Sequence, residues 1–282
     1  MKRTAFLLLL FSAFAFAACD GKNDDETTPG GGSDGPIAKY ALSQYMPEGA
    51  PGGTSIKHSM EVVTPEFDSQ NRLVKCHKDY WMPDTQALRS GDEADDFIQT
   101  VSEDWVYQYD DQRHTATLWI SGESYSYNDG KRSADPYSDA PITLRFDSNW
   151  RLTSDNQGKY NYTNDRLASG FIMGDDSNCT WTGGNLTSVG NDRFTYNITY
   201  SSEPNPFSFL DFGMIHVLPS DYVHGLMGKV CGNIPEQMTL NYSGDSQGYA
   251  VSFTKDKQGR LTQIRFDRLD NAGCYSTVDI EY

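Results

Sequence analysis

The sequence has few basic residues and none of the short motifs that mark common catalytic or metal sites. It carries 23 Lys and Arg residues against 39 Asp and Glu, a formal net charge of −16 over 282 residues. Nucleic acids and anionic lipids bind cationic surfaces, so neither is expected as a partner. No His-Glu-x-x-His, Gly-x-Ser-x-Gly or EF-hand-like loop occurs. We therefore assign no catalytic residue, cofactor or metal ligand, and a non-catalytic protein is favoured over an enzyme.

The residues that remain as candidates for chemistry are scattered along the chain. The histidines are His58, His77, His114, His216 and His224, and none is paired at helical i,i+4 spacing. The paired acids are Asp95-Asp96, Asp110-Asp111 and Asp175-Asp176. Glycosidase carboxylates and calcium ligands must converge in space, whereas neighbours on a strand point to opposite faces. A turn or a solvated edge is therefore the expected place for these acids.

Long apolar runs are missing except at the start of the chain. Lys2 and Arg3 precede an apolar stretch over residues 4–18, which ends in Ala17-Ala18-Cys19. A stretch of about 15 residues is too short for a membrane-spanning helix, which needs about 20. It is typical of a removable signal peptide, residues 1–18, and the cysteine at the cleavage point indicates a bacterial lipoprotein with lipid attached to Cys19.

Residues 19–36 contain no aromatic or aliphatic side chain that could enter a core. This acidic, Gly-rich segment is expected to be a flexible tether between the lipid and the rest of the protein. Its cluster Asp24-Asp25-Glu26 resembles the export signal that carries Bacteroidetes lipoproteins to the outer face of the outer membrane. The alternative is a merely soluble acidic linker.

Residues 37–282 are expected to form a single all-β domain. The segment contains no second linker, and polar and apolar residues alternate in many short stretches, as half-buried strands do. Phe194, Tyr196 and Ile198 share one face, for example, with Thr195 and Asn197 on the other. The other expected strands lie near residues 117–120, 142–146, 160–162, 251–254, 263–267 and 278–282.

A loose internal repeat runs through these strands: an aromatic residue, a polar turn, then Arg or Asn followed by Leu. Its copies begin at Phe67, Phe146, Tyr162, Trp181 and Phe253 and end at Arg72-Leu73, Arg151-Leu152, Arg166-Leu167, Asn185-Leu186 and Arg260-Leu261. We interpret each copy as a hairpin in which Leu begins the return strand on the buried face. The arginines are then turn-flanking charges that pair with nearby acids. The whole is an antiparallel β-meander of repeated hairpins that forms a large curved or barrel-like sheet.

One or two short helices are also predicted. Residues 220–228 offer an N-cap serine, apolar i,i+4 pairs and a terminating glycine. Residues 91–102 place acids early and then Phe97, Ile98 and Val101 on one stripe.

Four cysteines follow Cys19, namely Cys76, Cys179, Cys231 and Cys274. An exported protein can form disulfides, and the alternative is that these residues are small buried hydrophobes. In a simple meander Cys231 and Cys274 lie at opposite ends of the last strands. A disulfide requires Cα atoms about 4.4–6.8 Å apart, so we expect these two not to be bridged.

Three features carry a resemblance: the leader with its acidic tether, the repeated Arg-Leu hairpins, and the stretch from Tyr222 through Gly225-Leu226-Met227-Gly228-Lys229 to Asn233-Ile234-Pro235. In these features the chain resembles a family of Bacteroidetes lipoproteins. The family carries a domain of unknown function described as having a porin-like fold. The resemblance covers about residues 67–282. It implies an extended antiparallel β-meander or barrel-like sheet, and it implies no catalytic residue and no substrate.

Three classes of function stay open. The leading hypothesis is a surface-exposed lipoprotein of the outer membrane, anchored through Cys19, that binds a glycan, a protein or an envelope component. A glycan-binding or glycan-processing protein is the alternative, and the residues Trp81, Trp105, Trp119, Trp150 and Trp181 would suit sugar stacking, although core filling also explains them. A membrane-spanning β-barrel is the third class. Against it stand the anchor and a mean hydropathy of −0.61.

Overall fold

The structure, a computed structural model, describes residues 39–47, 55–70, 72–83, 97–128, 131–172, 174–205, 226–242 and 244–282. Within these ranges all regular elements are β-strands, and every strand pair is antiparallel. The strands are β1 (Lys39–Pro47), β2 (Ser55–Phe67), β3 (Leu73–Pro83), β4 (Phe97–Asp110), β5 (Thr115–Asn128), β6 (Lys131–Ser138), β7 (Ile142–Phe146), β8 (Leu152–Ser154), β9 (Asn161–Thr163), β10 (Arg166–Ile172), β11 (Asp175–Thr182), β12 (Asn185–Gly190), β13 (Phe194–Pro204), β14 (Asn233–Tyr242), β15 (Asp245–Lys255), β16 (Leu261–Arg268) and β17 (Tyr275–Glu281). A membrane-spanning helix is not found among the described residues.

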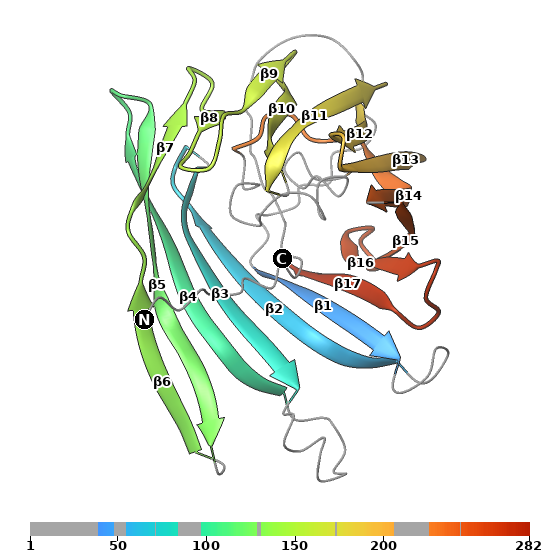
Figure 1. Ribbon diagram of the computed structural model, residues 1–282, viewed down its shortest axis with the longest axis horizontal. Helices are drawn as coiled ribbons and strands as arrows, with labels where there is room; N and C mark the ends of the chain where they lie inside the picture. Colours follow the sequence, from blue (N-terminus) through green and yellow to red (C-terminus); the bar gives the residue numbers. More distant parts are fainter. Residues whose placement is uncertain are drawn as a thin grey trace.

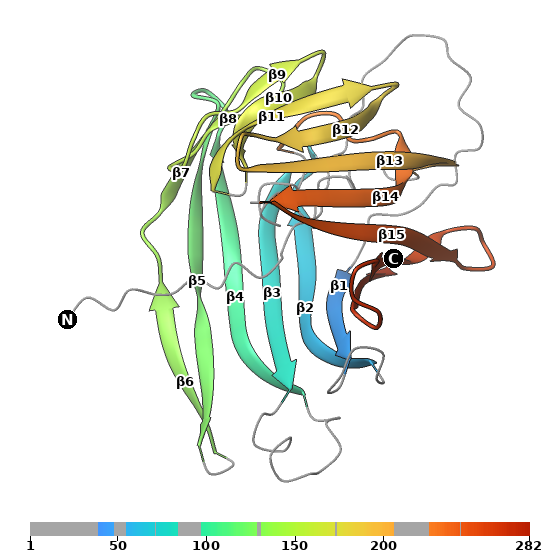
Figure 2. The ribbon, with the colours of Figure 1, turned by 45° about the vertical axis from the view of Figure 1, so that its right-hand side comes forward.

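The 17 strands form one sheet that curls almost completely round into a barrel (Figures 1 and 2). β1 pairs with β2 on one side and with β17 on the other, which joins the first and last strands. β5 pairs with β7 along its first residues and with β6 along the rest. The ring is completed through β8 and β9, which have three residues each. The bridge Ser154↔Lys159 joins the end of β8 to the residues just before β9, and β9 pairs with β10. The predicted barrel-like sheet of hairpins is confirmed.

The inner face of the sheet carries the apolar core. In β13 Phe194, Tyr196 and Ile198 are buried, while Asn197 and Thr199, which point to the other face, are exposed. Register partners on neighbouring strands share a face, so Tyr196 lies beside Leu240 of β14 and Val189 of β12. The period-two pattern of the sequence therefore predicted the correct faces.

The outer face is mainly polar. The exposed residues of β11 include Asn178, Thr180 and Thr182. β3 turns Lys75, His77 and Asp79 to the face opposite its buried residues, and β16 does the same with Gln263, Arg265 and Asp267. The barrel is thus apolar inside and hydrogen-bonding outside.

The five repeated turns gather at one end of the barrel, because each follows a strand that runs toward that end. The first copy, between β2 and β3, shows how they work. Asp68 Oδ1 accepts hydrogen bonds from the backbone N–H groups of Gln70 and Arg72 at 2.8 and 2.9 Å, and its Oδ2 accepts one from Arg72 Nε at 2.9 Å. The Arg72 guanidinium lies 4.4 Å from the ring centroid of Tyr109 in β4, whose hydroxyl donates to the Leu73 carbonyl at 3.0 Å.

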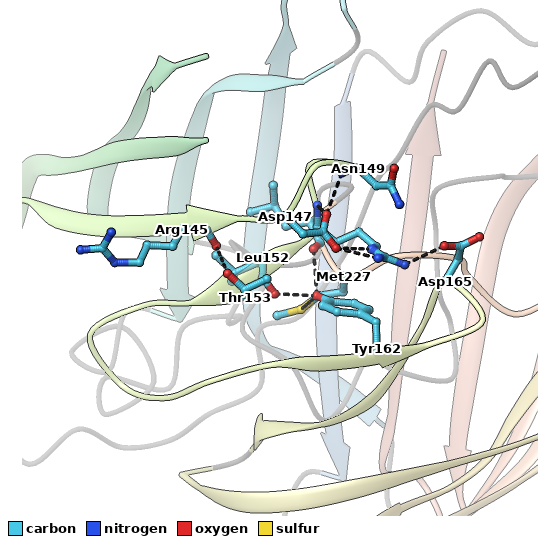
Figure 3. A network of polar contacts seen from close by, with 10 residues as sticks. Arg145, Asp147, Asn149, Leu152, Thr153, Tyr162, Asp165 and Met227 are labelled. Atoms are coloured by element: carbon cyan, nitrogen blue, oxygen red, sulfur yellow. Dashed lines mark hydrogen bonds and ion pairs between the residues drawn. The ribbon is translucent and has the colours of Figure 1, made fainter. Parts of the chain in front are cut away.

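Two other copies repeat the arrangement in full. In the β7–β8 turn Asp147 holds Arg151, the guanidinium lies over Tyr162, and the Tyr162 hydroxyl donates to the Leu152 carbonyl at 2.8 Å (Figure 3). The β15–β16 turn does the same with Asp256, Arg260, Tyr282 and Leu261. In the other two copies the donors to the leucine carbonyls are Trp181 Nε1 and the Tyr200 hydroxyl. All five leucines are fully buried, so the hairpin interpretation is confirmed. The pairing with acids is confirmed for Arg72, Arg151 and Arg260, whereas the Arg166 guanidinium lies over the Trp181 ring.

The stretch Leu226–Gly228 ties β8 to β10 near these turns. The Leu226 carbonyl accepts a hydrogen bond from the Leu152 N–H at 2.7 Å, and Gly228 forms a bridge with Arg166. Gly228 has φ +82°, and a Cβ there would lie 2.3 Å from the Asp165 carbonyl oxygen. Only glycine fits this position without strain.

The predicted helix over residues 91–102 is wrong where the structure describes it. Residues 97–102 belong to β4, with Val101 opposite Tyr80 of β3 and Ser124 of β5. Backbone pairing on both sides of β4 outweighs a short helical stripe. Residues 91–96, and residues 220–225 of the other predicted helix, lie outside the described residues. The described remainder of that segment, Leu226–Gly228, is not helical.

Candidate functional site

A row of charged side chains crosses the inner face of β2, β3 and β4. Cross-strand register places Tyr80 opposite Glu61, and Lys78 opposite Glu103. All four face the core because they share parity with the buried residues Val63 and Cys76. Glu61 is 5% exposed and Lys78 is 1% exposed. We call Glu61, Lys78 and Glu103 the inner charge row.

Lys78 lies between the two carboxylates. Its Nζ is 4.0 Å from Glu103 Oε1 and 3.9 Å from the ring centroid of Trp105, so an ion pair and a cation–π contact both stabilise it. The Tyr80 hydroxyl donates to Glu61 Oε1 at 3.1 Å. These contacts replace part of the hydration that the buried charges give up.

Tyr137 of β6 completes the row from the far side. Its hydroxyl donates to Glu103 Oε2 at 2.7 Å across Gly122, the residue between them in the register. A Cβ on Gly122 would meet the Ser102 carbonyl oxygen at 2.3 Å, so β4 and β5 approach too closely for any other residue. The glycine in mid-strand thus permits the close approach of the β4 backbone at Ser102 and Glu103.

Burial shifts the pKa values around the row. Burial raises the pKa of Glu61 to about 7, against the attraction of Lys78 and the hydrogen bond from Tyr80, which lower it. Burial also raises the pKa of the Cys76 thiol to about 12, which leaves it protonated and unreactive at neutral pH. The pKa of Tyr40 is raised well above its usual value by the same cause. The row contains a carboxyl that titrates near neutrality, but solvent does not reach it.

Sequence reasoning missed the inner charge row. The position of Lys78 in the sequence could have indicated it. Lys78 lies two residues from both Cys76 and Tyr80, so the three side chains share the face of the strand that points to the core. A charged residue on such a face indicates a buried partner of opposite charge. That partner comes from other strands, so spacing along the chain does not identify it.

The paired acids do not come together. Asp110 caps the β4–β5 turn by accepting from the Gln112 and Arg113 N–H groups, and Asp111 pairs with Arg72 at 2.5 Å. Asp175 pairs with Arg193 at 2.9 Å. The expectation of turn and edge roles is confirmed for these two pairs, while Asp95-Asp96 lies outside the described residues. No group of three or more metal-ligating side chains gathers within the described ranges.

The histidines are dispersed. His114 occupies the β4–β5 turn, His58 lies in β2, and His216 and His224 fall outside the described part of the chain. His77 lies on the outer face, where its Nδ1 is 2.8 Å from Asp104 Oδ1 and its Nε2 is 3.4 Å from Asp79 Oδ1.

The tryptophans fall into two groups. Trp105, Trp150 and Trp181 pack against the core, the last two within the repeated turns, and Trp81 is half-buried. Trp119 of β5 is 45% exposed on the outer face, beside its register partner Val106, which is 40% exposed. Core filling therefore explains most of the tryptophans and leaves Trp119 unexplained.

Cys76, Cys179, Cys231 and Cys274 form no disulfide with one another. Cys231 lies at the end of the repeated turns, where its Sγ accepts from the Leu186 N–H, whereas Cys274 precedes β17 at the opposite end. The predicted lack of a Cys231–Cys274 bridge is confirmed.

No protein-family model matches the sequence, and comparison with curated proteins finds no match. Among solved structures, the chain is similar to a porin-like protein from Bacteroides uniformis ATCC 8492, with 14% identity, a TM-score of 0.49, and coverage of 87% of this chain and 97% of that one. A second, from Bacteroides vulgatus ATCC 8482, has 11% identity, a TM-score of 0.27, and coverage of 87% and 98%. Both likenesses are too distant to establish a fold or family, so the barrel assignment rests on the strand pairing above.

Proposed function

We propose that this chain is a non-catalytic lipoprotein whose barrel stands in water at the outer face of the outer membrane and binds a ligand there. The leader and Cys19 supply the anchor. The tether of residues 19–36 has a mean reach of roughly 20–25 Å, enough to hold the barrel clear of the bilayer. β1 begins at Lys39, opposite Glu281, at the end of the barrel that carries the repeated turns.

The polar outer face is the observation that carries this proposal. A barrel that spans a membrane presents an apolar band about 25 Å tall to the lipid, and an Arg or Lys at the bilayer midplane costs roughly 2–4 kcal/mol. Here Lys75, Asp79, Asp104 and Arg265 lie within their strands on that face. These side chains keep their charge in water at a lower free-energy cost than in lipid. Their position on the outer face therefore supports an anchored barrel in water over a barrel that spans the membrane.

A binding role is supported over catalysis by where the ionisable groups lie. The carboxyl with a pKa near neutrality, Glu61, is closed off from any substrate by its burial. The exposed acids that could process a glycan are held in turns and ion pairs, as Asp110 and Asp175 show. A glycosidase needs two carboxyl groups facing one another across an open site.

Membrane fractionation of a Cys19→Ala variant in the native host tests the anchor. The wild type should sediment with the outer membrane and incorporate labelled fatty acid, and Cys19→Ala should lose the label and leave that fraction. Cys179→Ala, which removes a barrel thiol, is the matched control and should behave as wild type. If Cys19→Ala without label stays in the outer membrane after a carbonate wash, the spanning barrel is the correct alternative.

A further inference from the structure

The outer face of β4 and β5 carries an apolar spot within an otherwise hydrogen-bonding surface. Trp119 and Val106 lie side by side in the register and are both substantially exposed. Trp119 occupies the part of β5 where the partner strand changes from β7, which pairs up to Leu118, to β6, which pairs from Ser121 onward. The long strands β4 and β5 form the wall that carries this spot (Figure 2).

Polar groups border the spot and are held in place. Lys75 is the register partner of Val106, and His77 is that of Asp104 on the next row of the same face. Asp104 Oδ1 lies 3.1 Å from Lys75 Nζ and 2.8 Å from His77 Nδ1. Burial opposes ionisation of Asp104, but the hydrogen bonds from His77 and Lys75 outweigh it and lower its pKa. The carboxylate beside the spot is therefore charged and fixed in orientation.

The small size of the apolar spot favours a small ligand over a protein partner. A stable protein interface buries about 800 Å² on each side around an apolar centre, and two apolar side chains in a polar surround fall far short of that. Diagonal neighbours on a sheet are about 7–8 Å apart, which brings Asp104 within reach of a small ring stacked on Trp119. A sugar has one apolar C–H face, which suits an indole, and a rim of hydroxyls, which suits alternating carboxylate, ammonium and imidazole groups.

The net charge of the chain favours a neutral glycan over an acidic one. A formal net charge of −16 repels acidic polysaccharides, and the groups at the spot include both signs. Mixed, locally paired donors and acceptors match an uncharged polyol better than an ion.

We propose that Trp119, Val106, Asp104, Lys75 and His77, here named the Trp119 patch, form a binding site for a neutral glycan. The sugar ring stacks on the Trp119 indole, and Asp104 and Lys75 hydrogen-bond its hydroxyls. This assignment rests on the proposed function, since it identifies the ligand class of an anchored barrel whose outer face is open to water.

Affinity electrophoresis tests the patch on the whole lipoprotein purified in non-ionic detergent. The gels contain soluble starch, xylan, galactomannan or mixed-linkage β-glucan, with polygalacturonate as the acidic comparator. The wild type should be retarded by at least one neutral polysaccharide, and Trp119→Ala should weaken that binding about tenfold or more, with Trp119→Phe intermediate. Tyr242→Ala, which removes a side chain that is 56% exposed elsewhere, is the matched control and should bind as wild type.

Three outcomes would overturn the assignment: no retardation by any neutral polysaccharide, retardation by polygalacturonate alone, or unchanged binding by Trp119→Ala. Circular dichroism and urea unfolding check that Trp119→Ala keeps the fold, which its exposure leads us to expect. The purified protein is assayed away from membranes. A failure of glycan binding therefore leaves the Cys19 fractionation result standing, and a failure of lipid attachment leaves the glycan result standing.

Discussion

The hydroxyl of Tyr109 donates a hydrogen bond to the carbonyl oxygen of Leu73, 36 residues earlier in the chain, at 3.0 Å. The same relation recurs in all five repeated turns, with Tyr or Trp as the donor and a fully buried leucine as the acceptor. Each aromatic side chain therefore fastens its own strand to the start of a return strand. An arginine covers the ring in four of the five copies.

Removal of one such hydroxyl should lower the free energy of unfolding measurably. In Tyr162→Phe the buried Leu152 carbonyl loses its 2.8 Å hydrogen bond, and Leu226 loses a weaker one at 3.2 Å. We expect a loss of about 1–2 kcal/mol in urea unfolding at pH 7. Tyr125→Phe removes an exposed hydroxyl bonded to Glu123 and should change stability by less than about 0.5 kcal/mol. Equal effects of the two variants would show that the repeated hydrogen bond does not stabilise the barrel.

The inner charge row makes stability depend on pH near neutrality. The free energy of unfolding should decrease as the pH rises, because folded Glu61 keeps its proton up to a pKa of about 7 whereas the unfolded chain releases it near 4.5. Between these values the folded state binds more protons, so the decrease begins above pH 4.5 and levels off above pH 7. The total is of the order of 3 kcal/mol.

Urea unfolding of Glu61→Gln between pH 5 and 8 tests the sign of this effect. The variant should match wild type near pH 5 and be more stable by roughly 2 kcal/mol at pH 8, because glutamine does not ionise. Glu66→Gln, an exposed substitution in the same strand, should keep the wild-type profile. A wild-type stability that increases from pH 5 to pH 8 in parallel with Glu61→Gln would contradict the prediction.

Gly228 should tolerate no side chain. Gly228→Ala combines the cost of φ +82° with a Cβ 2.3 Å from the Asp165 carbonyl oxygen, so we expect a loss of more than about 2 kcal/mol in urea unfolding. Gly244→Ala provides the control, because Gly244 has φ +92° and no atom within 4 Å of the added Cβ. It should lose about 1 kcal/mol, and the difference between the two measures the steric clash. A similar loss in both variants would mean that the 226–228 stretch moves aside freely.

The acidic cluster after Cys19, the proposed site of lipid attachment, should direct display at the cell surface. Replacement of Asp24, Asp25 and Glu26 by alanine should protect the protein from protease added to intact cells, while lipid labelling of Cys19 is unchanged. A variant with Thr27 and Thr28 replaced by alanine is the control and should stay accessible. If protease still cleaves the cluster variant on intact cells as it cleaves the wild type, the acidic cluster is only part of the linker.

The sequence by itself determined the faces of the strands that it predicted and the hairpins that join several of them, because the period-two alternation and the turn chemistry act over a few residues. The hairpin at Asp68 to Leu73, for instance, is specified by an acid that caps its own turn and an arginine four residues later. The helix predicted over residues 97–102 failed for the opposite reason, since pairing with β3 and β5, which is remote in sequence, decided that segment.

Tertiary structure alone decided the candidate sites. Glu61, Lys78 and Glu103 meet because three strands align in one register, and a shift by one residue would turn each of them to the outer face. Trp119 looks like the other tryptophans in the sequence and differs from Trp105 in that it faces outward, where no core covers it. Burial, and with it pKa and access to a ligand, is a property of the closed sheet, because it depends on which remote strands lie on either side.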